Sequence, residues 1–561
     1  MSKILTFDNS FERHLSIAEQ KYKKGDLMGA LVFAFNAFFI QSDNVKVLSL
    51  IASIYADAGL YELAIEYWFL VLDKTPEEDR GDVYEQIAKI SFYEEDYYAT
   101  GYYMHKKIAK DGIVSEDLDK DILEFFKVLE TDRLKNKYKI VYPENKINYQ
   151  LVIEEGIDYA KQGNLTKAIE TFSTVPEESD LYLRARENLA AAYLLSGDVE
   201  GAGKSLKQAV KNGAESLAIY CALSAVWDEM GEMEKCVYYY KKALEFAPKD
   251  NDENLKLGIL ATKMEDHENV KKYLSRVVES QPFELNARHF LALAYLNSGE
   301  YEIALNHFNE LIKIVPDDYI TKYYLSLTKG LISKQINSNV LPIGYPDGVD
   351  IEEEKRRNKI ILELEKASIK NIDINIKKPE IKEILEWGVF EGEKEIAKKS
   401  IFILANTSDK FGIKILKKAL LCPTMEDYLK KIIIFLLISF SYTGKLGIVI
   451  QKVYRKINVK KLNFKTNAEL YLSAYAIAIT KAVYTGSNNT LDKLAFSANR
   501  VYNKFKDLTE EVFTKEDIAT IIIHDCGIKE LMPSRANEIF GVKKERFKYL
   551  KALYKNCKGK I

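Results

Sequence analysis

The sequence predicts an all-α protein in which pairs of antiparallel helices stack into a solenoid, followed by a second all-helical domain. Three observations lead to this prediction. Glycines recur at intervals of 34 residues, small residues recur at fixed offsets from them, and the apolar residues between them follow the three-four spacing of amphipathic helices. The 561 residues, 47% of them apolar and 29% charged, have the composition of a folded globular chain with room for about three domains.

The glycines mark the repeat. The interval of 34 residues separates Gly25 from Gly59 and, later in the chain, each neighbour in the series Gly163, Gly197, Gly231, Glu265 and Gly299. With these residues numbered as position 15 of a unit, small residues occupy position 8 (Ala18, Ala52, Ala190, Ser224, Ala292) and position 20 (Ala30, Ala64, Ala168, Ala202, Cys236, Ala304). Small residues allow two helices to cross closely, and glycine suits the end of the first helix because it adopts positive φ without strain.

Two further positions complete the pattern. Position 11 is aromatic in most units, and prolines that can stop the second helix stand at position 32, namely Pro76, Pro248, Pro282 and Pro316. These positions together resemble the tetratricopeptide repeat (TPR) family, and the stretches "GLYELAIEYWFLVLDKTP" and "GEYEIALNHFNELIKIVP" are similar to the second half of its unit. The whole chain resembles bacterial TPR proteins with a helical C-terminal extension.

The resemblance implies eight units. Units 1–3 occupy residues 1–110, and units 4–8 with a final capping helix occupy residues 149–334. The third unit fits more loosely, since Glu95 stands where glycine is usual. Residues 111–148 lack the motif and are either a degenerate repeat or an inserted helical spacer.

The resemblance also implies a right-handed superhelix whose concave groove binds a peptide or helix of another protein. The groove-facing positions of the family correspond here to Lys46, Ser49, Asp57, Arg184, Glu187, Asp228, Asn286 and His289. A clamp for the acidic tails of chaperones is not expected, because Ile153 and Ile157 stand where that clamp needs Lys and Asn.

Beyond the repeats, residues 335–350 ("QINSNVLPIGYPDGVD") contain two prolines and two glycines without an apolar period and are predicted to be a linker. Residues 351–561 again show helical periodicity between short breaks, which predicts stacked helix pairs of the HEAT type. Pro379 and Asp409 are expected at helix starts, where a missing N–H or a capping carboxylate is favourable.

Charge is divided unevenly along the chain. Residues 1–340 carry 40 Lys and Arg against 55 Asp and Glu, whereas residues 341–561 carry 41 against 28, so the net charge of −2 hides an acidic and a basic part. The acidic part favours a basic or amphipathic segment as the protein partner. Alternatively, the two parts dock on each other.

The expected compartment is the cytoplasm. Residues 1–10 lack the apolar segment of a secretory signal, and the longest apolar run, residues 432–438, is far shorter than the roughly 20 residues of a membrane-spanning helix. The five cysteines are scattered, with no CxxC pair, which is typical of reduced thiols.

No sequence motif indicates catalysis. Phosphate loops, dinucleotide fingerprints and hydrolase signatures are absent, and the six histidines are scattered, so neither a cofactor nor a metal site is predicted. His524, Asp525 and Cys526 are adjacent, but neighbours on one helix point in different directions and cannot assemble a nucleophilic triad. We therefore expect a non-enzymatic protein–protein interaction scaffold.

An alternative function comes from the basic part. The segment "RANEIFGVKKERFKYLKALY" (535–554) resembles a DNA-binding helix-turn-helix with Gly541 at the turn, although Asn537 stands where a small residue is needed. Its exposed nucleic-acid contacts would be Lys543, Lys544, Arg546 and Lys548. A second basic patch, Lys452, Arg455, Lys456, Lys460 and Lys461, could meet phosphate, a membrane surface or the acidic part. The alternative is thus a TPR-regulated nucleic-acid-binding protein.

Overall fold

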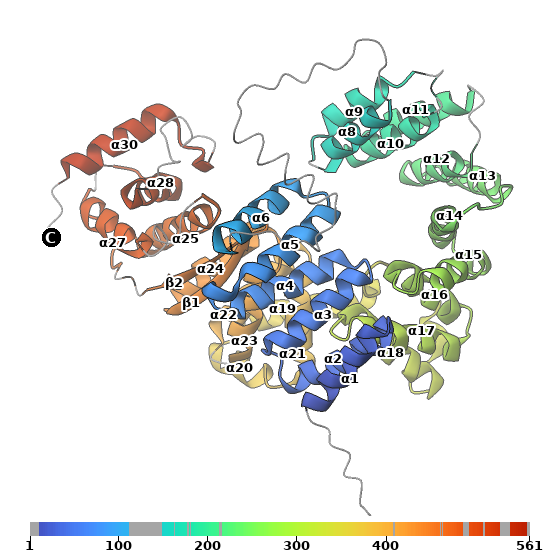
Figure 1. Ribbon diagram of the computed structural model, residues 1–561, viewed down its shortest axis with the longest axis horizontal. Helices are drawn as coiled ribbons and strands as arrows, with labels where there is room; N and C mark the ends of the chain where they lie inside the picture. Colours follow the sequence, from blue (N-terminus) through green and yellow to red (C-terminus); the bar gives the residue numbers. More distant parts are fainter. Residues whose placement is uncertain are drawn as a thin grey trace, which may run out of the picture. The chain divides into compact units, whose positions relative to one another are not determined.

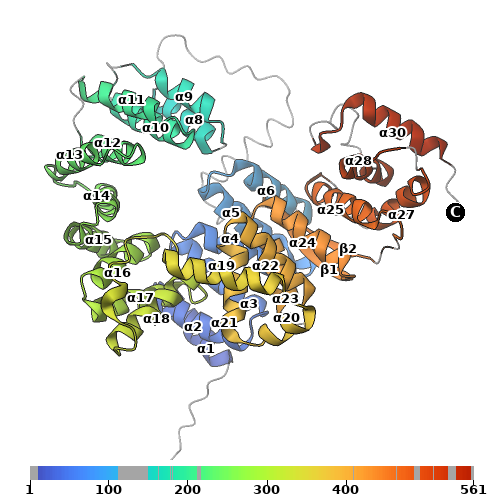
Figure 2. The ribbon, with the colours of Figure 1, turned by 180° about the vertical axis from the view of Figure 1, so that it is seen from behind.

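The computed structural model describes residues 11–111, 149–161, 163–176, 179, 181–211, 216–407, 410–460, 462, 464–485, 493–508, 511–527 and 539–557 (Figures 1 and 2). The chain forms two compact units. One unit joins the two ends of the chain, Met1–Leu134 and Ile351–Ile561, and the other is the middle part, Lys135–Asp350. The expected spacer lies almost wholly outside the described residues.

The N-terminal array consists of three helix pairs in the first unit. The pairs are α1 (Phe11–Lys23) with α2 (Leu27–Ile40), α3 (Val45–Asp57) with α4 (Tyr61–Lys74), and α5 (Gly81–Tyr93) with α6 (Tyr97–Asp111). A short 3₁₀ turn, η1 (Glu77–Asp79), connects the second pair to the third. All three pairs lie within the residues in which the 34-residue pattern places units 1–3, apart from Asp111 at the end of α6.

The middle unit contains five more pairs and a single final helix. The pairs are α8 (Tyr149–Lys161) with α9 (Leu165–Ser173), α10 (Tyr182–Leu195) with α11 (Val199–Lys211), α12 (Leu217–Glu229) with α13 (Met233–Leu244), α14 (Asn251–Lys263) with α15 (His267–Ser280), and α16 (Leu285–Asn297) with α17 (Tyr301–Ile314). The final helix is α18 (Tyr319–Ile332), which matches the predicted capping helix. A short η2 turn (Ser338–Val340) follows it.

The turn between the two helices of a unit keeps its conformation even where glycine is missing. Glycines at position 15 have positive φ, for example 76° at Gly59 and 80° at Gly299. Glu95 and Glu265, at the same position of their units, also have positive φ, of 59° and 51°. A side chain in this conformation costs about 1–2 kcal/mol, so the packing of the helix pairs outweighs the local preference.

The small residues lie where the helices cross, as predicted. Those at positions 8 and 20 are buried throughout, and in unit six Ser224 Oγ donates a hydrogen bond to the carbonyl oxygen of Cys236 at 2.9 Å. At position 8 of the next unit, a Cβ added to Gly258 would overlap the side chain of Leu274. The crossings therefore leave no room for larger side chains, and each pair buries its apolar face against its neighbours.

The C-terminal domain is mainly helical. Its helices are α19 (Ile351–Glu365), α20 (Ile369–Asn375), α21 (Pro379–Phe390), α22 (Lys394–Asn406), α23 (Lys410–Leu421), α24 (Asp427–Ser439), α25 (Ala468–Thr485), α27 (Leu494–Phe505), α28 (Lys515–Cys526) and α30 (Lys544–Asn556). Pro379 begins α21 as expected, and Asp409 lies outside the described residues. The all-α class is confirmed for the chain.

One element of this domain was not predicted. Strands β1 (Gly444–Ile450) and β2 (Val453–Val459) form an antiparallel hairpin with Ile450 paired to Val453. Gln451 and Lys452 make the turn, both with positive φ, which is the geometry of a two-residue type I′ turn. The strands are two short apolar runs between segments of helical periodicity, and for this reason the sequence predicts only helices here.

The hairpin packs on the second helices of the N-terminal array. Tyr103 of α6 is buried, its hydroxyl donates to the carbonyl oxygen of Lys452 at 2.6 Å, and it accepts the N–H of Tyr454 at 3.1 Å. Tyr454 in turn donates to Asp73 of α4 at 2.9 Å. Figures 1 and 2 show the orange strands beside blue α4–α6, so the two ends of the chain share one core.

Candidate functional site

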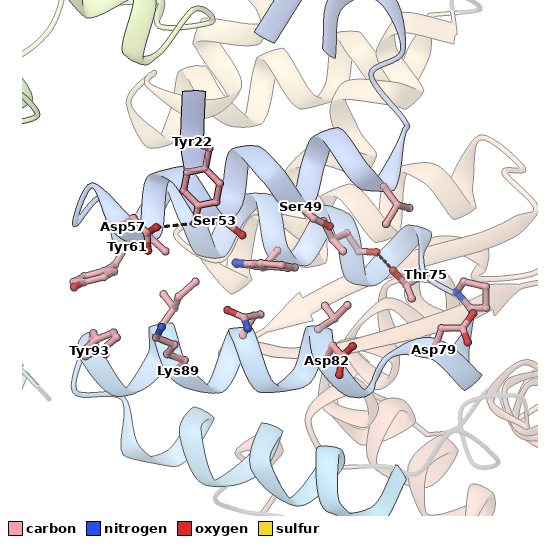
Figure 3. A pocket seen from close by; sticks show the side chains of 18 residues that line it. Tyr22, Ser49, Ser53, Asp57, Tyr61, Thr75, Asp79, Asp82, Lys89 and Tyr93 are labelled. Atoms are coloured by element: carbon pink, nitrogen blue, oxygen red, sulfur yellow. Dashed lines mark hydrogen bonds between the residues drawn. The ribbon is translucent and has the colours of Figure 1, made fainter. Parts of the chain in front are cut away.

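The first helices of the N-terminal array line a cavity, which we call the N-terminal groove. Its volume is about 950 Å³, and its lining comes from α1, α3 and α5 together with parts of α4 and the turn after it (Figure 3). The floor is apolar and consists of the buried side chains Trp68, Val71, Val83 and Ile90. Polar and aromatic side chains surround this floor, so the groove offers both apolar contact and charge.

Aromatic residues hold the edges of the N-terminal groove in place. Tyr22 of α1 donates a hydrogen bond to Asp57 Oδ2 of α3 at 2.6 Å, as Figure 3 shows. Burial, and then the neighbouring carboxylate, raises the pKa of Tyr22, so this hydroxyl stays protonated as a donor. Tyr61 and Tyr93 stack with ring centroids 5.4 Å apart. These contacts join successive units at the rim.

The N-terminal groove is acidic. Among the described lining residues, the exposed carboxylates Asp57, Asp79 and Asp82 outnumber the single lysine, Lys89. The indole N–H of buried Trp68 has no hydrogen-bond partner within the described part of the chain. An acidic rim over an apolar floor suits a ligand that combines positive charge, apolar side chains and hydrogen-bond acceptors.

The predicted groove residues of this array are placed as follows. Ser49 and Asp57 line the N-terminal groove. Lys46 is exposed on the same helix, but it is not part of the lining. Sequence reasoning missed Trp68, which lies on a second helix and so outside the usual groove-facing set, and Tyr93, which stands at position 13 of the more loosely fitting third unit.

In the middle unit, the structure brings several predicted residues together across successive first helices. Glu187 of α10 and Cys221 of α12 both interact electrostatically with Lys256 of α14, and burial raises the pKa of Glu187. Asp228 of α12 lies 3.5 Å from Lys263 Nζ of α14. The described side chains therefore form a polar surface along this array.

The remaining predicted residues of the middle unit differ from one another. Arg184 and Asn286 are exposed. His289 is half-buried, and its Nε2 lies 3.2 Å from the carbonyl oxygen of Pro346. The segment predicted to be a linker is thus in contact with the groove-facing side of α16.

Three residues of the second basic patch contact the N-terminal array. Lys452 Nζ lies 2.8 Å from Glu94 and 3.3 Å from Asp96, and Lys456 Nζ donates to the carbonyl oxygen of Asp73 at 2.6 Å. Arg455 forms a hydrogen bond with the hydroxyl of Tyr102. The sequence left phosphate, a membrane surface and the acidic part of the chain as partners for this patch. In the structure, these three side chains contact the acidic part.

The helix-turn-helix candidate is only partly described, since Asn537 lies outside the described residues. Gly541 has a φ of 70°, and Val542, Phe547 and Leu550 are buried, as the apolar side of such a motif requires. The predicted contact residues Lys543, Lys544 and Lys548 are exposed. Arg546 instead pairs with the buried Asp517 of α28 at 2.9 Å, so its charge is used inside the domain.

The adjacent His524, Asp525 and Cys526 point to different partners. His524 packs against the ring of Phe547, and Asp525 accepts hydrogen bonds from Arg500 and Tyr554. Burial raises the pKa of the Cys526 thiol to about 11, which keeps it protonated and unreactive.

The described residues contain neither a metal-ligand cluster nor a membrane-spanning helix. No group of three or more His, Cys, Asp or Glu side chains there has the arrangement of a metal site. Within the same residues, each helix is too short or too polar to span a bilayer.

Comparison with known families identifies the repeat. Models of the tetratricopeptide repeat match residues 153–216 and residues 285–318. The chain therefore contains tetratricopeptide repeats, as the spacing of its small residues predicts.

Individual relatives share only parts of the chain. Protein CTR9 homolog of Arabidopsis thaliana is 34% identical over 127 residues, which is 22% of this chain and 11% of that protein, so the chain spans about a tenth of its relative's length. YrrB, described as a TPR protein with an unusual peptide-binding site, is 18% identical, with 37% of this chain and 97% of that chain covered and a TM-score of 0.25. For a thermophilic TPR protein of Thermus thermophilus the identity is 19%, the coverage 32% and 98%, and the TM-score 0.26.

Proposed function

We propose that the chain is a non-enzymatic cytoplasmic scaffold and that its N-terminal groove binds a peptide segment of another protein that carries Lys or Arg beside apolar residues. The observation that carries this proposal is the set of three exposed carboxylates, Asp57, Asp79 and Asp82, above an apolar floor. Cationic side chains of the partner would pair with the carboxylates while its apolar side chains contact the floor.

The dimensions and accessibility of the groove support this proposal. A volume of about 950 Å³ accommodates several side chains of a peptide. The C-terminal domain contacts second helices, through residues such as Asp73 and Tyr103, whereas first helices provide most of the groove lining. The unpartnered indole N–H of Trp68 offers a donor that a backbone carbonyl of the ligand could satisfy after a small shift of the ring.

The test uses the full chain and fluorescent peptides of twelve residues that alternate Leu with Lys, with Glu or with Ser. We expect the Lys peptide to bind best, and we expect the triple variant Asp57→Asn, Asp79→Asn, Asp82→Asn to bind it about tenfold more weakly, since each lost charge pair contributes up to about 1 kcal/mol. Fluorescence anisotropy at low and high salt measures both effects.

The matched control removes three exposed carboxylates of the same array that lie outside the groove lining, in the variant Glu12→Gln, Glu19→Gln, Glu62→Gln. This variant changes the net charge by the same amount and should bind the Lys peptide as the unmodified chain does. Equal loss in both triple variants, or no preference among the three peptides, would contradict the proposal.

A further inference from the structure

Residues 341–350, which we call the strap, lie along the groove-facing side of α16 and α18 in the middle unit. Leu341, Ile343 and Tyr345 pack against the core of the middle unit. The strap has no helix or strand of its own, so side chains of the array bind its backbone groups. This is how a solenoid groove would hold an extended peptide.

Asn297, the last residue of α16, binds the strap backbone with both ends of its amide. Its Nδ2 donates to the carbonyl oxygen of Gly344 at 3.0 Å, and its Oδ1 accepts the N–H of Ile343 at 2.9 Å. Because both bonds are to backbone groups, they recognise the path of the backbone and do not depend on which side chains the segment carries. Gly344 has a φ of 76°, which permits the bend at this point without strain.

Tyr345 of the strap lies against two aromatic side chains of the middle unit. Its hydroxyl lies 2.6 Å from His267 Nδ1, and its ring centroid is 5.6 Å from that of His267 and 6.4 Å from that of Phe290. Burial raises the pKa of Tyr345, so the hydroxyl stays protonated and can donate to the imidazole.

The strap continues along the same surface. The carbonyl oxygen of Pro346 lies 3.2 Å from His289 Nε2, and the carbonyl oxygen of Gly348 accepts a hydrogen bond from Tyr324 at 3.1 Å. His289 and Asn297 stand at positions 5 and 13 of unit eight. Both positions belong to the set that the sequence analysis assigned to partner binding.

We propose that the α16–α18 groove is a binding site for an extended segment containing a Tyr-Pro pair preceded by an apolar residue and glycine, and that the strap is its built-in occupant. A segment of a partner protein with these same sequence features binds in this groove by displacing the strap. This proposal concerns the middle unit and is independent of the function proposed for the N-terminal groove.

The chemistry of the occupant defines the partner. Backbone bonds to Asn297, His289 and Tyr324 demand an extended chain, and the site between His267 and Phe290 demands an aromatic ring with a hydroxyl. Because the strap is tethered beside the groove, its effective concentration is in the millimolar range, about 1 mM or more, and it suppresses binding of any untethered competitor. Weakening the strap should therefore open the site.

The experiment measures binding of a fluorescent peptide with the sequence of residues 339–350, "NVLPIGYPDGVD", to the full chain. The variant Ile343→Ala, Tyr345→Ala weakens the strap and leaves the groove residues unchanged. We expect it to bind the peptide at least about tenfold more tightly than the unmodified chain, because the competent fraction of the groove rises. Adding Asn297→Ala to this variant should weaken binding by about tenfold again, since two hydrogen bonds are lost.

Three controls make the result decisive. The variant Val340→Ala, Asp347→Asn alters one exposed residue of the strap and the exposed residue just before it, and it should bind as weakly as the unmodified chain. A scrambled peptide should not bind to any variant, and circular dichroism checks that each variant is folded. Absence of binding to the folded strap variant at about 1 mM peptide, or binding that ignores Asn297→Ala, would show that the strap is a structural closure only and would overturn the proposal.

Discussion

At the scale of single residues, burial decides what the cysteines of this protein can do. It raises the pKa of the Cys221 thiol to about 12 and that of Cys422 to about 11, in each case chiefly because the thiolate would lose its hydration. A protonated buried thiol is a packing group rather than a nucleophile.

Burial also gives the middle unit a pH dependence through His307. Removal from water, and then the positive charge of Arg288, lowers the pKa of His307 to about 4, while an unfolded histidine titrates at about 6.5. Between these values the unfolded chain binds the proton and the folded chain does not, so stability falls as the pH decreases. We expect a loss of about 1–2 kcal/mol between about pH 7 and about pH 5.

Thermal unfolding followed across this pH range measures the effect. The variant His307→Gln should show a shallower decline, and a residual slope should remain because burial also lowers the pKa of His289 and of His524. An unchanged slope in His307→Gln would mean that folding does not lower the pKa of this imidazole.

Arg546 shows why charge on a helix is ambiguous in the sequence. Its spacing from Lys543 and Lys544 gives the same pattern whether the guanidinium meets a phosphate or a carboxylate of its own domain. The structure places it 2.9 Å from Asp517, a carboxylate that also accepts the backbone N–H of Thr514 in the capping box of α28. The partner is distant in sequence, so no local pattern could reveal it.

At the scale of elements, repetition made the helix pairs predictable. Each pair reuses the same small residues at its crossing, and eight copies of a weak pattern identify the phase even where Glu95 or Glu265 replaces glycine. The hairpin occurs once, its turn is Gln451–Lys452 rather than a glycine-containing pair, and its strands are stabilised by α4 and α6. The strand propensity of a seven-residue segment is too weak a signal to distinguish a strand from the helices predicted on either side.

The candidate sites were predictable in part for the same reason. Positions 5 and 13 of a unit face the groove wherever the repeat holds, which is why His289 appeared among the candidates. The strap looked like a linker because its prolines and glycines carry no period, and that composition equally suits an extended occupant whose backbone bonds go to side chains. Contacts with Asn297, which is 46 residues away in the sequence from Ile343, distinguish a linker from an occupant of the groove, and no local pattern reveals them.

One hydroxyl makes two of the hydrogen bonds between the hairpin and the N-terminal array. Tyr103 connects both sides of the turn, since it donates to Lys452 and accepts from Tyr454. The variant Tyr103→Phe leaves a buried N–H without its acceptor, which costs about 1–3 kcal/mol. We expect faster hydrogen exchange of the Tyr454 amide, measured by mass spectrometry, whereas Tyr238→Phe, which removes an exposed hydroxyl, should leave that amide protected. Equal protection in Tyr103→Phe would show that water or a shifted backbone replaces this bond.

At the scale of the whole molecule, the charge asymmetry of the sequence is organised within one compact unit. Met1–Leu134 carries a net charge of −10 and Ile351–Ile561 a net charge of +15, and these two ends of the chain fold together. Lys452 and Lys456 show where the opposite charges meet, against Glu94, Asp96 and Asp73. Units 1–3 of the repeat therefore belong to a different compact unit from units 4–8, although both follow the same 34-residue pattern.

This arrangement predicts that the two ends recognise each other without the middle unit. When Met1–Leu134 and Ile351–Ile561 are expressed as separate chains in one cell, we expect them to copurify at low salt, because the hairpin contacts combine buried hydrogen bonds with partly buried ion pairs. The variant Lys452→Glu places a negative charge beside two carboxylates and should abolish copurification. Lys543→Glu makes the same charge change at an exposed site and should not. Separate elution of the unmodified chains would show that continuity of the chain, rather than the contact itself, holds the ends together.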